Sequence, residues 1–186
     1  MKFLKWFLVV VAVLALLFFF IFRPYMRKQT KTHSPEITNV YQKNDFDLSV
    51  TYSSPKKKGR VIFGELVPYD VVWRTGANEP TKFSTSTTIR IADKSLAPGR
   101  YSLWTKPGKE SWNVIFNKGI PDWGVTVLSG GKETSRNPEE DVVEVTVPTE
   151  ILNDNIENFT IDFEDNGELF MSFSWDKTKV KVPINK

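Results

Sequence analysis

Apolar side chains recur at every second position through most of the chain after residue 47, and this alternation limits the fold more than any other feature. Successive side chains of a β-strand point to opposite faces, so period two indicates strands. No long window beyond an N-terminal apolar segment has the 3.6-residue period of a helix. The pattern therefore predicts about eight short strands, each with one buried face and one face in water. The alternating runs are 48–52, 83–91, 101–103, 112–116, 143–147, 159–163, 169–175 and 180–184.

The clearest connection between two runs is Asp165-Asn166-Gly167-Glu168. Asn-Gly between alternating runs predicts a hairpin with a type I′ turn, because that turn needs positive φ at both central residues. Residues 149–155 are the one candidate for a turn of helix. The sequence thus predicts an all-β fold, an antiparallel β-sandwich for which jelly-roll and immunoglobulin-like topologies both stay open.

Composition removes several classes of function. The chain has 186 residues, of which 40% are hydrophobic and 13% aromatic, which suits one globular domain with appendages and not a disordered chain. It has no cysteine, which excludes disulfides, thiolate nucleophiles and iron–sulfur clusters. Its single histidine, His33, precedes the strands, so the domain lacks a Ser-His-Asp triad and the usual zinc ligands. We expect no catalytic residue, no cofactor and no metal site, and the sequence favours no enzymatic activity.

The N-terminal segment 3–22 is interpreted as a transmembrane signal anchor. Residues 7–22 contain no charged or polar side chain, and the stretch approaches the roughly 20 residues that cross a bilayer core. A cleavable signal peptide is the alternative, because Lys2 and Lys5 precede the apolar run. Cleavage favours small residues where the run ends, and this chain ends it with Phe-Phe-Phe-Ile-Phe-Arg-Pro. An uncleaved anchor is therefore favoured.

Residues 23–39 are polar and are expected to form a linker, followed by the β-domain at 40–186. Basic residues flank both ends of the apolar run, so the positive-inside rule does not separate the two orientations. The short N-terminal tail nevertheless resembles that of a signal anchor, which exports the domain on its C-terminal side. We expect a single-pass membrane protein that contacts the lipid bilayer through this helix, with the domain on the periplasmic side.

The distribution of charge argues against a nucleic-acid partner. Six of the 25 basic residues precede the first acidic residue, Glu36. The remainder carries 19 basic against 22 acidic side chains, a formal charge of −3. A nucleic-acid-binding domain is expected to carry its positive charge on its folded part. We therefore expect no nucleic acid among the partners.

The stretch Trp-Arg-Thr-Gly-Ala-Asn-Glu (73–79) is the leading candidate for a ligand site. Gly76 and Asn78 tolerate positive φ and predict a tight turn. Arg74 offers a planar fork that matches a carboxylate or a phosphate. We therefore name Arg74, Asn78 and Glu79 as candidate ligand-binding residues.

The alternative for this turn is structural. In that interpretation Arg74 pairs with Glu79 or Glu65 and merely holds a long connection together. Because neighbouring side chains of a strand point to opposite faces, we expect Trp73 to be largely buried and Arg74 to lie on the other face.

Two tryptophans, Trp104 and Trp123, are candidates for binding a carbohydrate. Trp104 has the opposite parity from Tyr101 and Leu103, and Trp123 lies in a loop beside Asp122. An exposed aromatic ring next to polar side chains can pack against a sugar, although core packing is the alternative. The candidate ligands of the domain are therefore a carbohydrate, a peptide or an anionic small molecule.

Acidic residues leave an enzymatic alternative open. A hydrolase with two carboxylates would use Glu65 together with Asp70 or Glu79, but nothing in their spacing favours this over chance. A calcium site at 162–166 is chemically allowed, yet the hairpin turn already explains those residues. The favoured function is a non-catalytic module that binds a ligand or a partner.

The chain carries five characteristic blocks, at 52–64, 68–69, 73–79, 98–103 and 112–118. Together they resemble the DUF2911 family, a set of bacterial domains of unknown function found mainly in Bacteroidetes. The block at 73–79 is the most specific, and the likeness covers roughly 52–184. Family members usually look exported, which implies the periplasmic orientation. Many have glycine after the Pro-Tyr pair, where this chain has Asp70. The resemblance implies no established activity and no catalytic residues.

Overall fold

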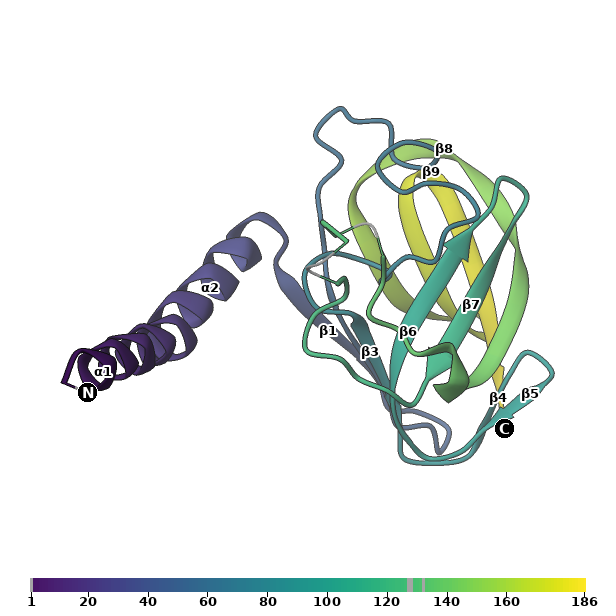
Figure 1. Cartoon of the computed structure of the whole chain (residues 1–186). Coiled ribbons are helices and arrows are strands. Elements are labelled where there is room, and N and C mark those ends of the chain that lie inside the picture. The colour runs from purple at the N-terminus through teal and green to yellow at the C-terminus, as the bar shows by residue number, and fades with distance from the viewer. Residues whose placement is uncertain (1, 127–128, 132) are drawn as a thin grey trace. The chain divides into compact units, whose positions relative to one another are not determined.

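The computed structural model describes residues 2–126, 129–131 and 133–186. The chain divides into two compact units, Met1–His33 and Ser34–Lys186 (Figure 1). The first is helical, and its described residues include none that is buried. Its helix is long and apolar enough to cross a membrane, a property that signal sequences share. It consists of α1 (Lys2–Leu17), the π-helical turn η1 (Phe18–Phe22) and α2 (Arg23–His33).

The segment expected as a linker has regular structure. The helix continues through η1 into α2 and ends only at His33, and β1 (Glu36–Tyr41) begins three residues later. Pro24 lies just after η1, where a local change of helix type accommodates its missing N–H. The β-domain therefore begins at Ser34 rather than at residue 40.

The second unit is an antiparallel β-domain, as the alternation predicted. Nine strands of its described residues form one sheet in the order β1-β2-β3-β6-β7-β8-β9-β4-β5. After β1, the strands are β2 (Leu48–Ser53), β3 (Thr81–Thr85), β4 (Ile89–Ile91), β5 (Lys94–Leu96), β6 (Gly99–Pro107), β7 (Ser111–Asn117), β8 (Asp141–Asp165) and β9 (Leu169–Asn185), with the 3-10 turn η2 (Pro138–Glu140) before β8.

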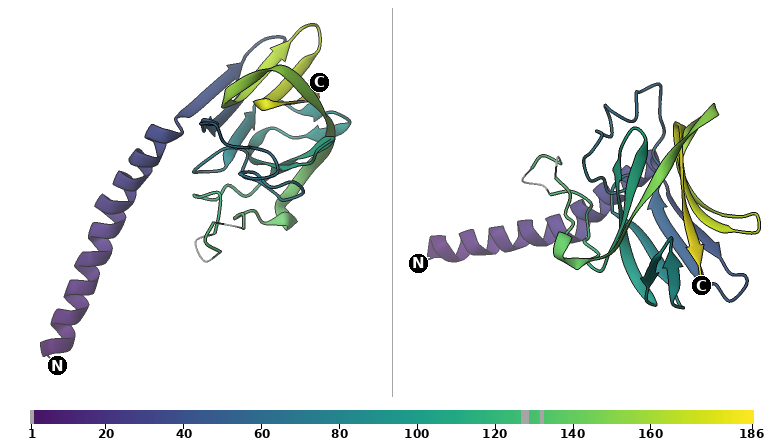
Figure 2. Two further views of the ribbon diagram at one scale, coloured as in Figure 1. Left: turned by 90° about the horizontal axis from the view of Figure 1, so that it is seen from above. Right: turned by 90° about the vertical axis from the view of Figure 1, so that its right-hand side faces the viewer.

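The sheet folds over because β8 belongs to both halves of it. The first part of β8 pairs with β7 up to Pro148, and from Thr149 it pairs with β9. The β8–β9 hairpin therefore faces the strands β1-β2-β3-β6-β7, and Figures 1 and 2 show the two layers. The alternating apolar residues fill the space between them. All buried residues of this core lie between Tyr41 and Ile184. The β-domain therefore has a hydrophobic core of its own.

Two local predictions need correction. Residues 149–155 lie in β8 and not in a turn of helix, because Thr149 and Ile151 pair with β9 before the register shifts. The hairpin at 165–169 is present, but Asp165 pairs with Leu169 and the loop has three residues. Only Gly167 there has positive φ, so the turn is not type I′.

β1 and the C-terminal part of β8 are joined by side-chain hydrogen bonds and not by backbone pairing. Asn39 Nδ2 donates to the Ile161 carbonyl at 2.6 Å. The Tyr41 hydroxyl donates to Asp165 Oδ2 at 2.7 Å, and this hydrogen bond lowers the pKa of the Asp165 carboxyl. The two layers are thereby joined at the open side of the domain.

Candidate functional site

Trp73 fixes the position of the candidate turn against the sheet. Its N–H donates to the Thr105 carbonyl at 2.6 Å, and the Thr105 N–H donates to the Trp73 carbonyl at 3.0 Å. Residue 73 therefore forms a bridge with β6 beyond the N-terminal end of β3. The ring packs against Phe159 and Trp175, with centroids 5.0 and 6.1 Å away. Trp73 therefore faces the core as expected, although the residue is only half-buried.

The turn after Arg74 has an unusual backbone. Thr75, Gly76 and Asn78 have φ of 58°, 140° and 60°. Glycine and asparagine were expected to adopt positive φ, but a β-branched residue rarely does. Thr75 is held there by hydrogen bonds, because its carbonyl accepts from Thr81 Oγ1 at 2.6 Å and its hydroxyl lies 3.0 Å from Thr105 Oγ1. Such conformations cost about 1–3 kcal/mol each and concentrate at functional sites.

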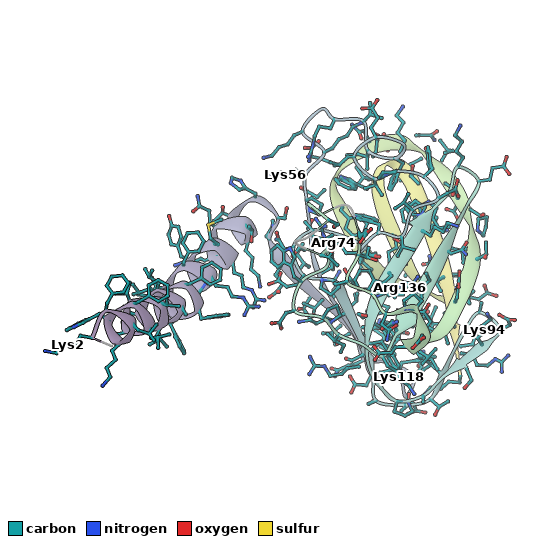
Figure 3. All side chains as sticks on the ribbon, viewed as in Figure 1. Lys2, Lys56, Arg74, Lys94, Lys118 and Arg136 are labelled. Carbon is teal, nitrogen blue, oxygen red and sulfur yellow. The ribbon has the colours of Figure 1, made fainter. Side chains whose placement is uncertain are left out.

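Arg74 is labelled in Figure 3, and its packing on Gly124 puts it on the face of the sheet that the β7–β8 connection covers. The Trp73–Thr105 bridge puts Arg74 beside Trp104, because paired residues of antiparallel strands share a face. The aliphatic stem of Arg74 packs on Gly124 so closely that a Cβ added there would lie 2.4 Å from Arg74 Cδ. The side chain is therefore fixed by packing in the connection between β7 and β8.

The guanidinium of Arg74 lacks the carboxylate that was expected for it. Its Nε is buried without a hydrogen-bond partner. Among the described residues it forms no ion pair with Glu79 or Glu65. Burial lowers the pKa of Arg74, because desolvation disfavours the charged form. The fold thus holds a cation that is mostly removed from water, with no ion pair to a described carboxylate.

Asn78 supplies a second buried donor without an acceptor. The residue is 8% exposed, and its Nδ2 has no hydrogen-bond partner. Its backbone carbonyl accepts from the Gly124 N–H at 3.3 Å, so Gly124 contacts both Arg74 and Asn78. A buried donor left without an acceptor costs about 1–3 kcal/mol. Together the two side chains offer donors and positive charge, which suit a carboxylate or phosphate oxygen.

Glu79 belongs to a different cavity. It lines a space of about 10 Å³ together with Glu36 and Lys82, at the β1–β2 side of the turn. A cavity of this size holds about one water molecule. Arg74 and Asn78 do not line it. Arg74 and Asn78 instead share a neighbour, Gly124, which Arg74 contacts through its side chain and Asn78 through its backbone carbonyl.

Trp104 is fully buried, which corrects the expectation of an exposed ring. Its exposed fraction is 0%, and its Nε1 donates to Ser102 Oγ at 2.7 Å. Ser102 in turn donates to the Gly119 carbonyl at 2.5 Å, so the β7–β8 connection lies over this face of the sheet. Trp123 belongs to the same connection and is half-buried, with its carbonyl accepting from Ser135. Trp104 is therefore not an open platform for a sugar ring, whereas the hypothesis for Trp123 stays a prediction.

The carboxylates of the hydrolase alternative lie in separate places. Glu65 is exposed on a loop. Asp70 lines an open depression of about 400 Å³ beside Lys106 and Lys109, and Glu79 lines the small cavity described above. Asp70 has φ of 60°, a conformation that glycine adopts freely and aspartate tolerates. The described residues contain no group of three or more His, Asp or Glu side chains suited to a metal ion.

Fold and turn together define the class of protein: an antiparallel β-domain, preceded by one apolar helix, with a buried cationic turn on the outer face of its sheet. The chain belongs to the family described as Protein of unknown function (DUF2911), whose profile matches residues 34–184. The match begins at Ser34, where the compact β-domain also begins. It confirms the resemblance seen in the sequence and extends it toward the N-terminus. No curated protein and no solved structure matches the chain.

Proposed function

We propose that this protein is a membrane-anchored, periplasmic binding module that holds an anionic group of its ligand at Arg74 and Asn78 and does no chemistry on it. The observation that carries the proposal is the pair of buried donors, Arg74 Nε and Asn78 Nδ2, which lack acceptors in one strained turn. The uncleaved N-terminal helix spans the membrane once and keeps the domain at the bilayer.

A purely structural role for Arg74 accounts poorly for these contacts. A buried arginine that only holds a connection together is expected to face a carboxylate, because an unpaired buried charge costs several kcal/mol. Here burial lowers the pKa of Arg74, and no ion pair with a described residue offsets it. An anion bound from outside would supply the missing charge and the missing acceptors at once.

The two donors and the charge of Arg74 also restrict the chemical class of the ligand. A carboxylate or phosphate oxygen accepts from both donors and neutralises the guanidinium, whereas a neutral sugar hydroxyl does only the first. Because Trp104 is buried beneath the β7–β8 connection, stacking on it does not contribute. The ligand is therefore an acidic peptide, an acidic sugar or a small organic anion, recognised through its anionic group.

The test is a thermal-unfolding comparison of residues 34–186 in sodium acetate, sodium phosphate and sodium chloride at equal ionic strength. A ligand that binds only the native state stabilises it, by about 2.7 kcal/mol at a hundredfold excess over Kd. We expect acetate or phosphate to raise the Tm above that in chloride, and the two salts separate a carboxylate site from a phosphate site. A response equal to chloride in both salts contradicts the proposal.

Arg74→Met is the informative variant, because it keeps an aliphatic stem against Gly124 and removes the donors. We expect it to lose the anion response without lowering the Tm in chloride. Arg136→Met is the matched control: Arg136 forms an ion pair with Asp141 on the same side of the sheet, so this change lowers the Tm and keeps the anion response. If Arg74→Met unfolds the domain instead, Arg74 has a structural role in this turn and the proposed anion site there is wrong.

A further inference from the structure

The connection between β2 and β3 presents an aliphatic pair to solvent. Val61 and Leu66 are 53% and 44% exposed, while their neighbours Ile62 and Val67 are buried in the core. The Leu66 N–H donates to the Val61 carbonyl at 3.4 Å, and the Val67 N–H donates to the Ile62 carbonyl at 2.9 Å. The loop is therefore closed on itself, with one pair of side chains anchoring it and the other pair held outward.

Basic side chains stand next to this pair. Lys56, Lys58 and Arg60 are exposed, and the Arg60 side chain folds back to donate to the carbonyls of Lys56 and Lys57 at 2.5 and 3.0 Å. In the described part of the chain, the ammonium groups of Lys56 and Lys58 have no acidic partner.

Lys57 attaches the same segment to the domain. It forms an ion pair with Asp176 at 2.5 Å, and its N–H donates to the Glu157 carbonyl at 2.7 Å. Figure 1 shows the loop projecting beyond the ends of the strands, and Figure 3 labels Lys56 upon it. A preformed projection thus carries both aliphatic and cationic side chains, with Glu65 as the single acid between residues 56 and 67.

We infer that this loop, residues 56–67, docks on an anionic lipid surface. Exposed aliphatic side chains insert at the boundary between headgroups and acyl chains, and neighbouring cations contact the anionic headgroups. Each cation near such a surface contributes about 1 kcal/mol, so the loop alone binds weakly. The inference rests on the membrane anchoring proposed above and is independent of the anion site at Arg74.

The helical tether makes weak docking effective. α2 has 11 residues, which at 1.5 Å rise per residue extend about 16 Å beyond the apolar run. β1 begins after only two further residues, Ser34 and Pro35. A domain held this close experiences a high effective concentration of lipid, so a contact that is weak in free solution becomes populated.

The first test uses the full chain in lipid nanodiscs. Because the sequence has no cysteine, Val61→Cys gives a single attachment site for a polarity-sensitive fluorophore. We expect a blue shift in discs rich in phosphatidylglycerol, none in phosphatidylcholine discs, and reversal of the shift by high salt. Ile151→Cys is the control, because Ile151 is 76% exposed on β8 and is expected to stay in water. Equal spectra for position 61 in both discs overturn the inference.

The second test uses residues 34–186 and phosphatidylglycerol vesicles in a flotation assay. Replacing Lys56 and Lys58 by Gln is expected to lower the partition coefficient roughly 30-fold, since each cation contributes about fivefold. Val61→Ser with Leu66→Ser is expected to lower it further, and Ile151→Ser, which changes an exposed aliphatic side chain outside the loop, to leave it unchanged. Flotation that persists in the loop variants overturns the inference. In the fluorescence experiment, a blue shift at position 61 that appears without lipid and grows with protein concentration also overturns the inference, because the loop then contacts a second copy of the chain.

Discussion

At the scale of single residues, Gly76 lies against the backbone of Ser53 in the turn after Arg74. A Cβ at this position would lie 2.8 Å from the Ser53 carbonyl oxygen, and φ is +140°. Gly76→Ala therefore combines a backbone clash with an unfavourable conformation, and we expect it to lower the free energy of unfolding by about 3 kcal/mol.

Gly59 is the matched control for that substitution. Its φ is +70°, and nothing lies within 4 Å of a Cβ placed there, so Gly59→Ala is expected to cost about 1 kcal/mol. Urea unfolding of residues 34–186 measures both values. Equal losses in the two variants would show that the contact with Ser53 does not constrain the turn.

The site was partly predictable from its residues. Positive φ at Gly76 and Asn78 follows from the chemistry of those side chains, and the orientation of Arg74 follows from strand parity. The positive φ of Thr75 and the burial of Trp104 were not predictable. The first depends on hydrogen bonds to Thr81 and Thr105, and the second on a distant connection that covers the sheet.

At the scale of elements, the two-residue period identified the strands but not their partners. Alternation is a local property, so it indicated most strand positions and the core face of each. It did not distinguish β3 from β4 within the run 83–91 or show that β8 serves two layers. Those features depend on pairing between segments far apart in the chain, which a single sequence does not encode locally.

The β8–β9 hairpin also determines a pH dependence. Tyr41 lowers the pKa of Asp165 by donating a hydrogen bond to its carboxylate. Burial opposes the charged form of Glu164, but hydrogen bonds from Lys179 and Ser172 and the charges of Lys179 and Lys181 outweigh it, so its pKa is also lowered. Groups with a depressed folded-state pKa stabilise the fold above their unfolded pKa, and this contribution is lost as pH falls through the folded-state pKa.

Tyr41→Phe tests this linkage, because it removes the hydrogen bond to Asp165 and keeps the ring. We expect the wild-type protein to be the more stable one near neutral pH. The difference in unfolding free energy between the two proteins should begin to shrink below about pH 4, the ordinary pKa of an unfolded aspartate, and be lost as the pH falls through the lower folded-state pKa of Asp165. Urea unfolding at several pH values between neutral and strongly acidic measures it. A difference that is constant across this range would mean that Asp165 does not respond to Tyr41.

At the scale of the whole molecule, the two units differ in how far they bury their apolar side chains. The described residues of the helical unit include none that is buried, so this unit has no hydrophobic core among them. The β-domain, by contrast, buries its apolar residues in its own core. This division is expected if a bilayer provides the burial that the helix lacks.

The apolar helix leads to a prediction about how the full chain fractionates. We expect the full chain to stay in the membrane fraction after alkaline carbonate extraction and to be released by detergent, because its helix is long and apolar enough to cross a membrane and the apolar run has no small residues at its end. A reporter enzyme fused after Lys186 should be active only if it is of a kind that works outside the cytoplasm. Activity of a cytoplasmic reporter alone would reverse the orientation. Recovery of a shortened chain without detergent would show that the helix is a cleaved signal sequence, and the tethered docking of residues 56–67 would then lose its basis, whereas the anion site at Arg74 would be unaffected.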